Sequence, residues 1–188
     1  ERDFIFHSEA TIWKDPVTAM QRTKALGLLH KTVRGNASMS RMGIPDYLVA
    51  MRVPGDVDVD ERVKHTIESY PVSYWQQIAS PVWMDVNPND TLQYRSAREN
   101  DDERHICPLQ LEVILRAIEL WTNPGDTVLS PFMGIGSEGF VSLGGATAKG
   151  RRLESPRRFV GIELKESYYR QSIANLAAVE NVKQPTLF

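Results

Sequence analysis

The sequence predicts an α/β fold: part of a mixed, mostly parallel sheet flanked by helices, with an antiparallel edge hairpin and a small insertion. Three features lead to this prediction: a β-α-β pattern over residues 127–163, two strand-like segments near the N-terminus, and an irregular aromatic stretch between these two regions. A chain of 188 residues is long enough to bury a core without disulfides.

The two N-terminal strands would pair as the hairpin. Residues 4–13 are rich in aromatic and β-branched side chains that partly alternate, and residues 47–53 form a second such run that stops at Pro54-Gly55. The basic segment between them is expected to be a long mobile loop that could include a short helix.

The stretch from 56 to 104 predicts a small ordered insertion. Its prolines divide it into short pieces, but four aromatic residues give it more apolar content than a linker would have: Tyr70, Tyr74, Trp75 and Trp83. We therefore expect three parts, with boundaries at 1–55, 56–104 and 105–188.

The last part carries the β-α-β pattern. Pro108 is expected in the first turn of a helix whose apolar residues recur at helical spacing up to Trp121. A short strand at 127–129, a glycine-bearing loop at 131–136 and a helix capped by Ser137 should follow. A polar loop would then lead to a strand at 159–162 that ends at Glu163, and to an amphipathic helix over 166–179.

The glycine loop and Glu163 predict a site for a cofactor that contains adenosine. Gly134 and Gly136 allow the backbone to approach a ligand, the helix that begins near Ser137 directs free amides at it, and an acid at the next strand end can accept hydrogen bonds from a ribose. The same glycines fit the dinucleotide fingerprint, so an NAD site and a turn without a ligand remain alternatives. The position of the motif near the chain end favours a cofactor with one adenosine.

Charge, cysteine content and apolar runs indicate the compartment in which the protein would occur. The net charge is -2, and the single cysteine, Cys107, excludes an internal disulfide and fits a reducing cytoplasm. No apolar run approaches the roughly 18 residues of a membrane span. Because the chain starts at Glu1 in what reads as the middle of a domain, we expect an N-terminal truncation.

Two long segments resemble DNA methyltransferases that modify exocyclic amines, forming N6-methyladenine or N4-methylcytosine. They are residues 105–111 (HICPLQL) and, after a helix, residues 123–137 (NPGDTVLSPFMGIGS). Residues 159–164 (FVGIEL) followed by two tyrosines, and the strands near Trp13 and at 47–54, resemble further segments of that family. Their order is that of the beta-type permutation, and the resemblance implies a partial Rossmann-like S-adenosylmethionine-dependent methyltransferase fold.

The resemblance also implies a set of residues that bind S-adenosylmethionine. Phe132 would lie near the adenine or the thioether, although a place in the core is an alternative for a large aromatic. Ser130 stands where the family usually has Asp. The full set is His105, Cys107, Pro108, Ser130, Pro131, Phe132, Gly134, Gly136, Ser137 and Glu163.

The catalytic motif of that family does not occur in this sequence. The family supplies Asp, Asn or Ser followed by Pro-Pro and an aromatic residue, which hold a flipped base and its amine. The nearest match is Ser80-Pro81-Val82-Trp83, which we interpret as an ordinary turn. The true motif is expected upstream of Glu1, so the fragment alone should be inactive, and the missing N-terminal part becomes an expected partner.

The implied function is transfer of a methyl group from S-adenosylmethionine to a DNA base amine, without a metal or a membrane. Residues 16–45 lack any acidic side chain, and their five lysines and arginines are candidate contacts to the DNA backbone, with a solvated loop as the alternative: Arg22, Lys24, Lys31, Arg34 and Arg41. Base choice would lie in 56–104. Two other functions remain alternatives: an NAD-binding oxidoreductase fragment and a non-catalytic DNA-binding module. The polar stretch at 144–158, which contains a second basic cluster at 149–158, is either a disordered loop or a phosphate contact.

Overall fold

The computed structural model describes residues 3–93, 97 and 108–183, with the backbone alone at 22–23 and 180–183. The chain divides into two compact units, the first formed by Glu1–Val57 with Tyr70–Val86 and the second by Asp58–Ser69 with Asn87–Phe188. The segment from 56 to 104 is therefore shared between the units, and its role in target recognition stays a prediction.

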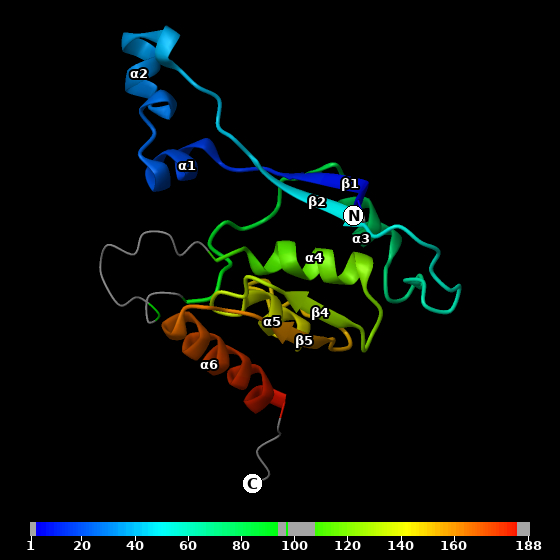
Figure 1. Cartoon of the computed structure of the whole chain (residues 1–188). Coiled ribbons are helices and arrows are strands. Elements are labelled where there is room, and N and C mark those ends of the chain that lie inside the picture. Colours follow the sequence, from blue (N-terminus) through cyan, green and yellow to red (C-terminus); the bar gives the residue numbers. More distant parts are fainter. Residues whose placement is uncertain (1–2, 94–96, 98–107, 184–188) are drawn as a thin grey trace. The chain divides into compact units, whose positions relative to one another are not determined.

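The first unit contains the predicted hairpin. Strand β1 (Ile5–Ile12) pairs antiparallel with β2 (Asp46–Arg52), from Ile5 opposite Arg52 to Ile12 opposite Asp46, with a bulge between Phe6 and Ser8 (Figure 1). The short strand β3 (Val82–Trp83) runs parallel to β1 on its other edge, so the order is β2-β1-β3.

One face of this sheet carries the core of the first unit. Ile12 is buried, and Leu48 and Ala50 on the same face of β2 are half-buried, whereas Tyr47, Val49 and Met51 on the opposite face are exposed. This alternation follows from the two-residue repeat of a strand that is covered on one side. Trp83 and Ile78, the last residue of α3 (Val72–Ile78), complete the core, and the indole nitrogen of Trp83 donates to the Ile78 carbonyl at 2.9 Å.

The basic segment between β1 and β2 is more ordered than the predicted loop. It holds two α-helices and two 3-10 turns: α1 (Pro16–Thr23), η1 (Leu26–Leu28), α2 (His30–Gly35) and η2 (Ala37–Met39). Asp15 caps α1 by accepting from the Thr18 amide at 2.8 Å, and Lys24 ends it in the left-handed region at φ 51°. The prediction allowed for one short helix in this loop, and the structure has more helix than that, because segments of three to eight residues give little periodic signal in a sequence. We call residues 16–45 the basic arm.

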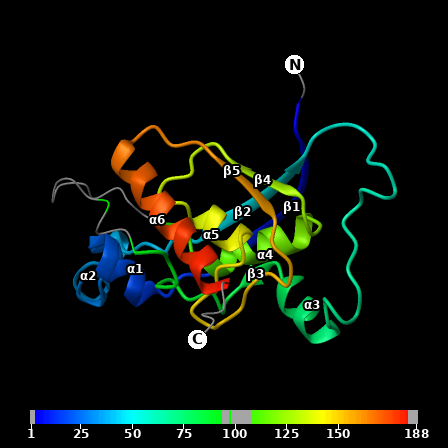
Figure 2. The ribbon, with the colours of Figure 1, turned by 90° about the horizontal axis from the view of Figure 1, so that it is seen from below.

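The second unit confirms the β-α-β pattern. Strands β4 (Thr127–Ser130) and β5 (Arg158–Gly161) pair in parallel, and α5 (Ser137–Ser142) connects them. Helices α4 (Leu111–Trp121) and α6 (Glu166–Lys183) both contact α5, which also contacts the two strands (Figure 2). The core lies between α4, α5 and the loop before β5: Leu111, Ile114, Leu115, Ile118, Val141 and Leu153.

Two helix starts differ from the sequence prediction. Helix α4 begins at Leu111 after its N-cap Gln110, so Pro108 precedes the helix instead of lying in its first turn. The Leu111 amide donates to the Asp90 carbonyl at 2.8 Å, a tertiary contact that satisfies one free amide of the helix start. Gly136, at φ 86°, is the N-cap of α5, and Ser137 is the first helical residue.

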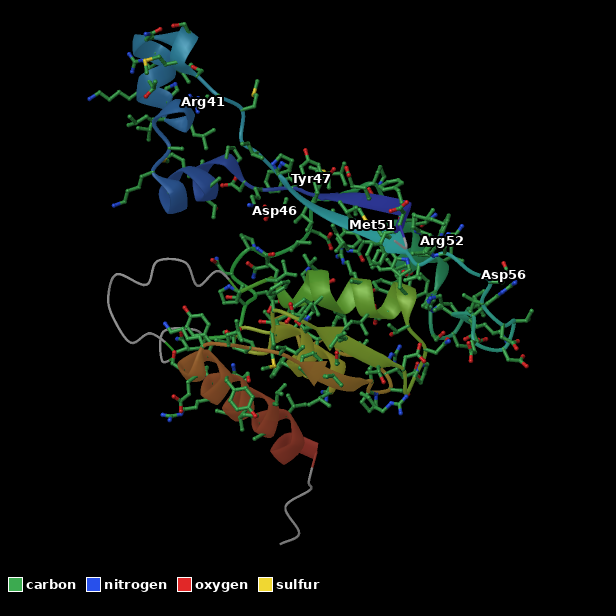
Figure 3. The ribbon with its side chains drawn as sticks, viewed as in Figure 1. Arg41, Asp46, Tyr47, Met51, Arg52 and Asp56 are labelled. Atoms are coloured by element: carbon green, nitrogen blue, oxygen red, sulfur yellow. The ribbon has the colours of Figure 1, made fainter. Side chains whose placement is uncertain are left out.

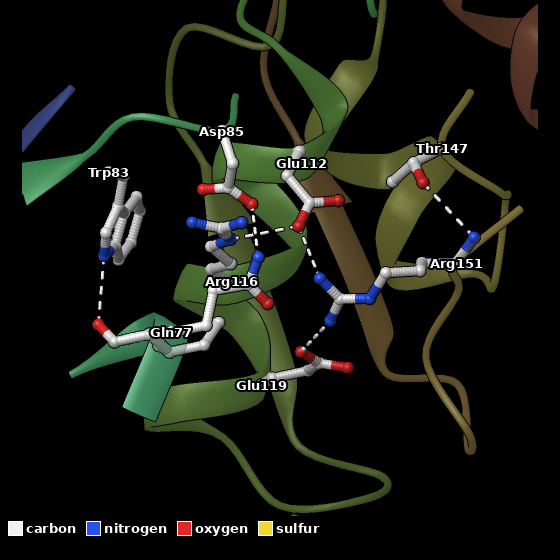
Figure 4. Close-up of polar contacts among 9 residues, drawn as sticks. Gln77, Trp83, Asp85, Glu112, Arg116, Glu119, Thr147 and Arg151 are labelled. Carbon is white, nitrogen blue, oxygen red and sulfur yellow. Dashed lines mark hydrogen bonds and ion pairs between the residues drawn. The ribbon is translucent and has the colours of Figure 1, made fainter. Parts of the chain in front are cut away.

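The basic loop before β5 is tied to α4 through charge. Glu112, a buried carboxylate, accepts from the Arg116 Nε at 3.0 Å and from Arg151, which also pairs with Glu119 at 3.2 Å (Figure 4). Arg157 donates to the Thr122 hydroxyl at 2.8 Å. These two arginines of the basic cluster therefore hold the loop in place. Among the described residues, no helix has both the length and the apolarity to cross a membrane.

Candidate functional site

The candidate site is the bend that follows β4. The Ser130 carbonyl accepts from the Ile162 amide, and the Met133 amide donates to the Ile162 carbonyl, both at 2.9 Å, so the carboxyl ends of β4 and β5 stay side by side. The chain then turns at Gly134 (φ 55°) and Gly136 (φ 86°), a backbone region that favours glycine. The bend thus lies at the edge of a parallel sheet where α/β folds bind ligands.

Glu163 lies against this bend. Its Oε2 accepts from the Gly134 amide and its Oε1 from the Lys165 amide, both at 2.8 Å. The carboxylate and the glycine bend therefore meet at the same end of the sheet. A carboxylate offers about four lone-pair sites, so two backbone donors fix its orientation and leave acceptor capacity on both oxygens.

Helix α6 contacts the bend and stabilises it. The Asn175 side-chain amide donates to the Ile135 carbonyl at 2.8 Å, and buried Ile135 packs against Tyr168. Gly136 lies so close to Ser172 that a Cβ on this glycine would come within 3.0 Å of the serine Cβ. The bend is therefore fixed by packing with α6 as well as by its own turns.

Three apolar side chains near the bend and the end of β5 are exposed. Phe132 is 88% exposed, which excludes the alternative that it belongs to the core, and Leu164 is 98% exposed. Ile162 is also exposed. The sequence reasoning missed Ile162 and Leu164, although their alternation around Glu163 was a signal that both project to the open face of the strand end.

The structure brings together only part of the predicted cofactor set. The residues from Ser130 to Ser137 and Glu163 meet at the bend, with Ser130 and Ser137 buried and Pro131 exposed. Pro108 is half-buried ahead of α4. His105 and Cys107 lie outside the described residues.

A second acid at the bend was not predicted. Glu138 occupies the first turn of α5, and burial raises the pKa of its carboxyl from the ordinary value of 4.5. A glutamate directly after the Gly136-Ser137 pair was the available signal, but its burial depends on tertiary packing. A partly desolvated carboxyl beside the candidate site is itself a functional candidate.

The basic arm presents its cations to solvent. Lys24, Lys31, Arg34 and Arg41 are exposed, and the side chain of Arg22 is outside the description. The Arg41 amide donates to the Gly27 carbonyl at 2.9 Å. This bond joins the beginning of the arm to the segment that leads to β2, where Arg41 lies (Figure 3). A Cβ on Gly27 would lie 2.9 Å from the Arg41 Cγ, so the glycine makes room for the arginine stem.

The nearest match to a catalytic tetrapeptide is a bend only in its first half, so the prediction of an ordinary turn was wrong for its second half, which is a strand. The Ser80 hydroxyl donates to the Val82 carbonyl at 2.8 Å, and Val82 and Trp83 form β3. Trp83 is only 2% exposed, so its ring is a core residue and cannot hold a flipped base. Of the other aromatic residues in the insertion, Tyr70 and Tyr74 pack edge to face, whereas Trp75 is exposed.

Known proteins share this arrangement. A family model described as DNA methylase matches residues 9–175. YubD of Escherichia coli (strain K12), named as a methylase, is 35% identical over 91 residues, which are 48% of this chain and 34% of YubD. The type II methyltransferase M.BglI of Bacillus subtilis is 37% identical over 81 residues, which are 43% of this chain and 20% of the relative.

Solved structures agree on the fold. TTHA0409 of Thermus thermophilus, named as a DNA modification methylase, aligns with 94% of this chain and 55% of its own at a TM-score of 0.56 and 18% identity. Its complex with S-adenosyl-L-methionine aligns at a TM-score of 0.53 and 17% identity, over 94% of this chain and 54% of its own. The chain thus spans about a third or less of the two relatives named above, and about half of TTHA0409.

The family match takes in the second half of β1, the basic arm, the glycine bend and Glu163. It replaces the alternative of an oxidoreductase fragment, and the parallel strands with the carboxylate at the bend agree with it. This chain belongs to the N6/N4 DNA methylase family.

Proposed function

We propose that this chain is the cofactor-binding part of a DNA methyltransferase that uses S-adenosylmethionine and acts on an exocyclic base amine, adenine N6 or cytosine N4. The observation that carries the proposal is the Glu163 carboxylate, oriented by the amides of Gly134 and Lys165 at the end of β5. Family membership supplies the reaction class.

The residues at the bend fit an adenosyl group. Glu163 keeps acceptor capacity on both oxygens, which is what a ribose diol requires. A Cβ on Gly134 would meet none of the described residues within 4 Å, which supports an approach of a ligand to the backbone there. Exposed Phe132, in the bend, offers apolar surface to an adenine ring or a thioether.

Bound S-adenosylmethionine would supply an electrophilic methyl group on its sulfonium. In this proposal the residues of this chain bind and orient the cofactor: Glu163 anchors the ribose, the bend at 131–136 wraps the adenosyl end, and Phe132 shields it from water. Removal of the amine proton and the hold on a flipped base belong to a Pro-Pro-aromatic tetrapeptide. The sequence lacks this motif, so we infer that the chain alone transfers no methyl group and that another polypeptide segment completes the site.

DNA is the proposed macromolecular substrate. The basic arm would contact phosphates, which position the duplex without selecting sequence, and base choice would come from the residues between 56 and 104. The single cysteine fits a reducing compartment, and we propose that the protein acts in the cytoplasm.

Cofactor identity is tested by isothermal titration of the 188-residue chain with S-adenosylhomocysteine and with NADH, of which only the first should bind. Phe132→Ala should weaken S-adenosylhomocysteine at least several-fold without lowering Tm, because the ring is exposed. Phe4→Ala, which truncates an exposed phenylalanine on the first unit, is the matched control. Binding of NADH alone would overturn the proposal.

Catalysis is tested by transfer of tritiated methyl groups to duplex DNA. The 188-residue chain should transfer none, and a longer polypeptide that adds the tetrapeptide should be active. Transfer by the chain alone would show that the inferred inactivity is wrong. A longer polypeptide that binds DNA but transfers nothing would instead favour the second candidate, a non-catalytic DNA-binding module, for which the missing tetrapeptide is the specific observation.

A further inference from the structure

The basic arm exposes large apolar side chains among its cations. Met42 is 92% exposed and Ile44 80% exposed, and both follow Arg41 in the segment that leaves η2 for β2. Leu26 and Met39, elsewhere on the arm, are exposed as well. Scattered exposed apolar residues need no explanation, but two such residues close together in the chain do. We call the segment that carries them, residues 41–44, the tip of the arm.

Local geometry favours joint projection of Met42 and Ile44. Ile44 precedes Pro45, which restricts it to extended backbone, and in an extended chain residues two apart point to the same side. The tip is also anchored, because the Arg41 amide is bonded to the Gly27 carbonyl and the Arg41 stem passes close to Gly27. The pair therefore extends from a fixed base.

Charge identifies the surface that would receive this tip. The four exposed cations of the arm all precede the apolar pair in sequence, with Arg41 directly before Met42, and residues 16–45 include no acidic side chain. A polyanion complements such a surface, whereas an apolar protein groove would leave the cations unpaired. Duplex DNA is the polyanion that also offers an apolar interior, between its stacked bases.

We propose that Met42 and Ile44 form an apolar wedge that enters between base pairs of duplex DNA while Arg41 and the other cations of the arm bind the flanking phosphates. This inference rests on the proposed function, since it assumes that DNA is the substrate. The wedge would unstack a base step and kink the duplex, and a loosened step lowers the energy needed to expose a base amine.

The experiment separates insertion from phosphate contact. The 188-residue chain is titrated with a duplex that contains 2-aminopurine, between about 50 and 200 mM salt, and both affinity and fluorescence are measured. M42A/I44A should lose the rise in 2-aminopurine fluorescence and about ten-fold in affinity, because the gain from burying two apolar side chains is partly offset by unstacking. Its slope of log affinity against log salt should match that of the parent.

The charge variant should behave in the opposite way. Arg41→Ala removes one phosphate contact, so its salt slope should fall by about 0.9. Met84→Ala, an exposed methionine outside the arm, is the control and should change neither quantity. Circular dichroism of each variant checks that the fold is intact.

Each outcome has a distinct meaning. If M42A/I44A keeps the fluorescence rise and the affinity of the parent, the wedge is excluded while DNA binding stands. If the chain binds S-adenosylhomocysteine but no duplex, the wedge fails and the cofactor site survives. If it binds anionic lipid vesicles and no duplex, the arm is a membrane contact and the wedge is again excluded.

Discussion

Replacing Glu163 by Gln tests the anchor on which the cofactor site depends. The carboxylate accepts from two backbone amides, one from Gly134 and one from Lys165, both at 2.8 Å. A glutamine keeps only one acceptor oxygen, so its NH2 group must face one of these donors or turn toward the ligand. Either placement removes at least one hydrogen bond to a ribose hydroxyl.

The expected loss of cofactor affinity follows from the loss of the negative charge. A hydrogen bond to a charged group contributes about 1.5–3 kcal/mol, and the loss of one corresponds to about 10- to 150-fold weaker binding. The bend itself should also loosen, because the Gly134 amide loses a charged acceptor. Glu163→Asp keeps the charge but is one methylene shorter, so it should not reach both amides and should also bind weakly.

Isothermal titration with S-adenosylhomocysteine measures the effect, and thermal unfolding shows that each variant is folded. Glu154→Gln, which neutralises an exposed glutamate of the loop before β5, is the matched control and should bind like the parent. If folded Glu163→Gln binds within two-fold of the parent, Glu163 does not anchor the ribose, and the reasoning from the strand end is refuted.

Three further predictions concern stability, measured as the free energy of unfolding in urea. Gly136→Ala should destabilise by more than the roughly 1–2 kcal/mol of left-handed strain, because its Cβ meets α6, whereas Gly150→Ala, at φ 76° with nothing within 4 Å, should cost only that strain; equal losses would contradict the close contact. Burial raises the pKa of Glu138, so the folded state holds its proton more tightly than the unfolded chain, and stability falls as pH rises above 4.5. Glu138→Gln should therefore be more stable than the parent at about pH 7 and equal to it below pH 4.5; a constant difference would exclude this cause. Glu112→Gln removes the charge of a buried carboxylate that pairs with two guanidinium groups, and it should lower the free energy of unfolding by about 3–5 kcal/mol. Glu119→Gln, which loses one partly exposed ion pair, should cost about 1 kcal/mol or less.

The basic loop before β5 shows how a charged segment can have a structural role. Arg151 belongs to a run of cations that reads as a phosphate contact, yet its guanidinium pairs with two carboxylates of α4. The partner Glu112 lies 39 residues earlier, so no local pattern could reveal the pairing. In the basic arm, by contrast, the lack of acidic residues is visible in the sequence, and the four cations whose side chains are described are exposed.

The sequence by itself determined the hairpin, the β-α-β unit and the place of the glycine bend. Alternation in residues 4–13 and 47–53, and the helical period after Leu111, are local consequences of which face is buried, so they can be read without the fold. For the basic arm the sequence indicated only that a short helix was possible, since segments of six to eight residues with few buried side chains are too short for a periodic pattern to show how many helices form.

Only the tertiary structure decided how the site is held. The bond from Gly134 to Glu163 joins residues 29 apart, the α4 start is satisfied by the Asp90 carbonyl, and Gly136 caps α5 because its backbone is left-handed against α6. Each of these contacts depends on two segments that meet only after the chain has folded. The residue types in the two segments allow each contact but do not specify it. The sequence therefore indicates the chemistry of the site, and the packing of α4, α5 and α6 fixes its geometry.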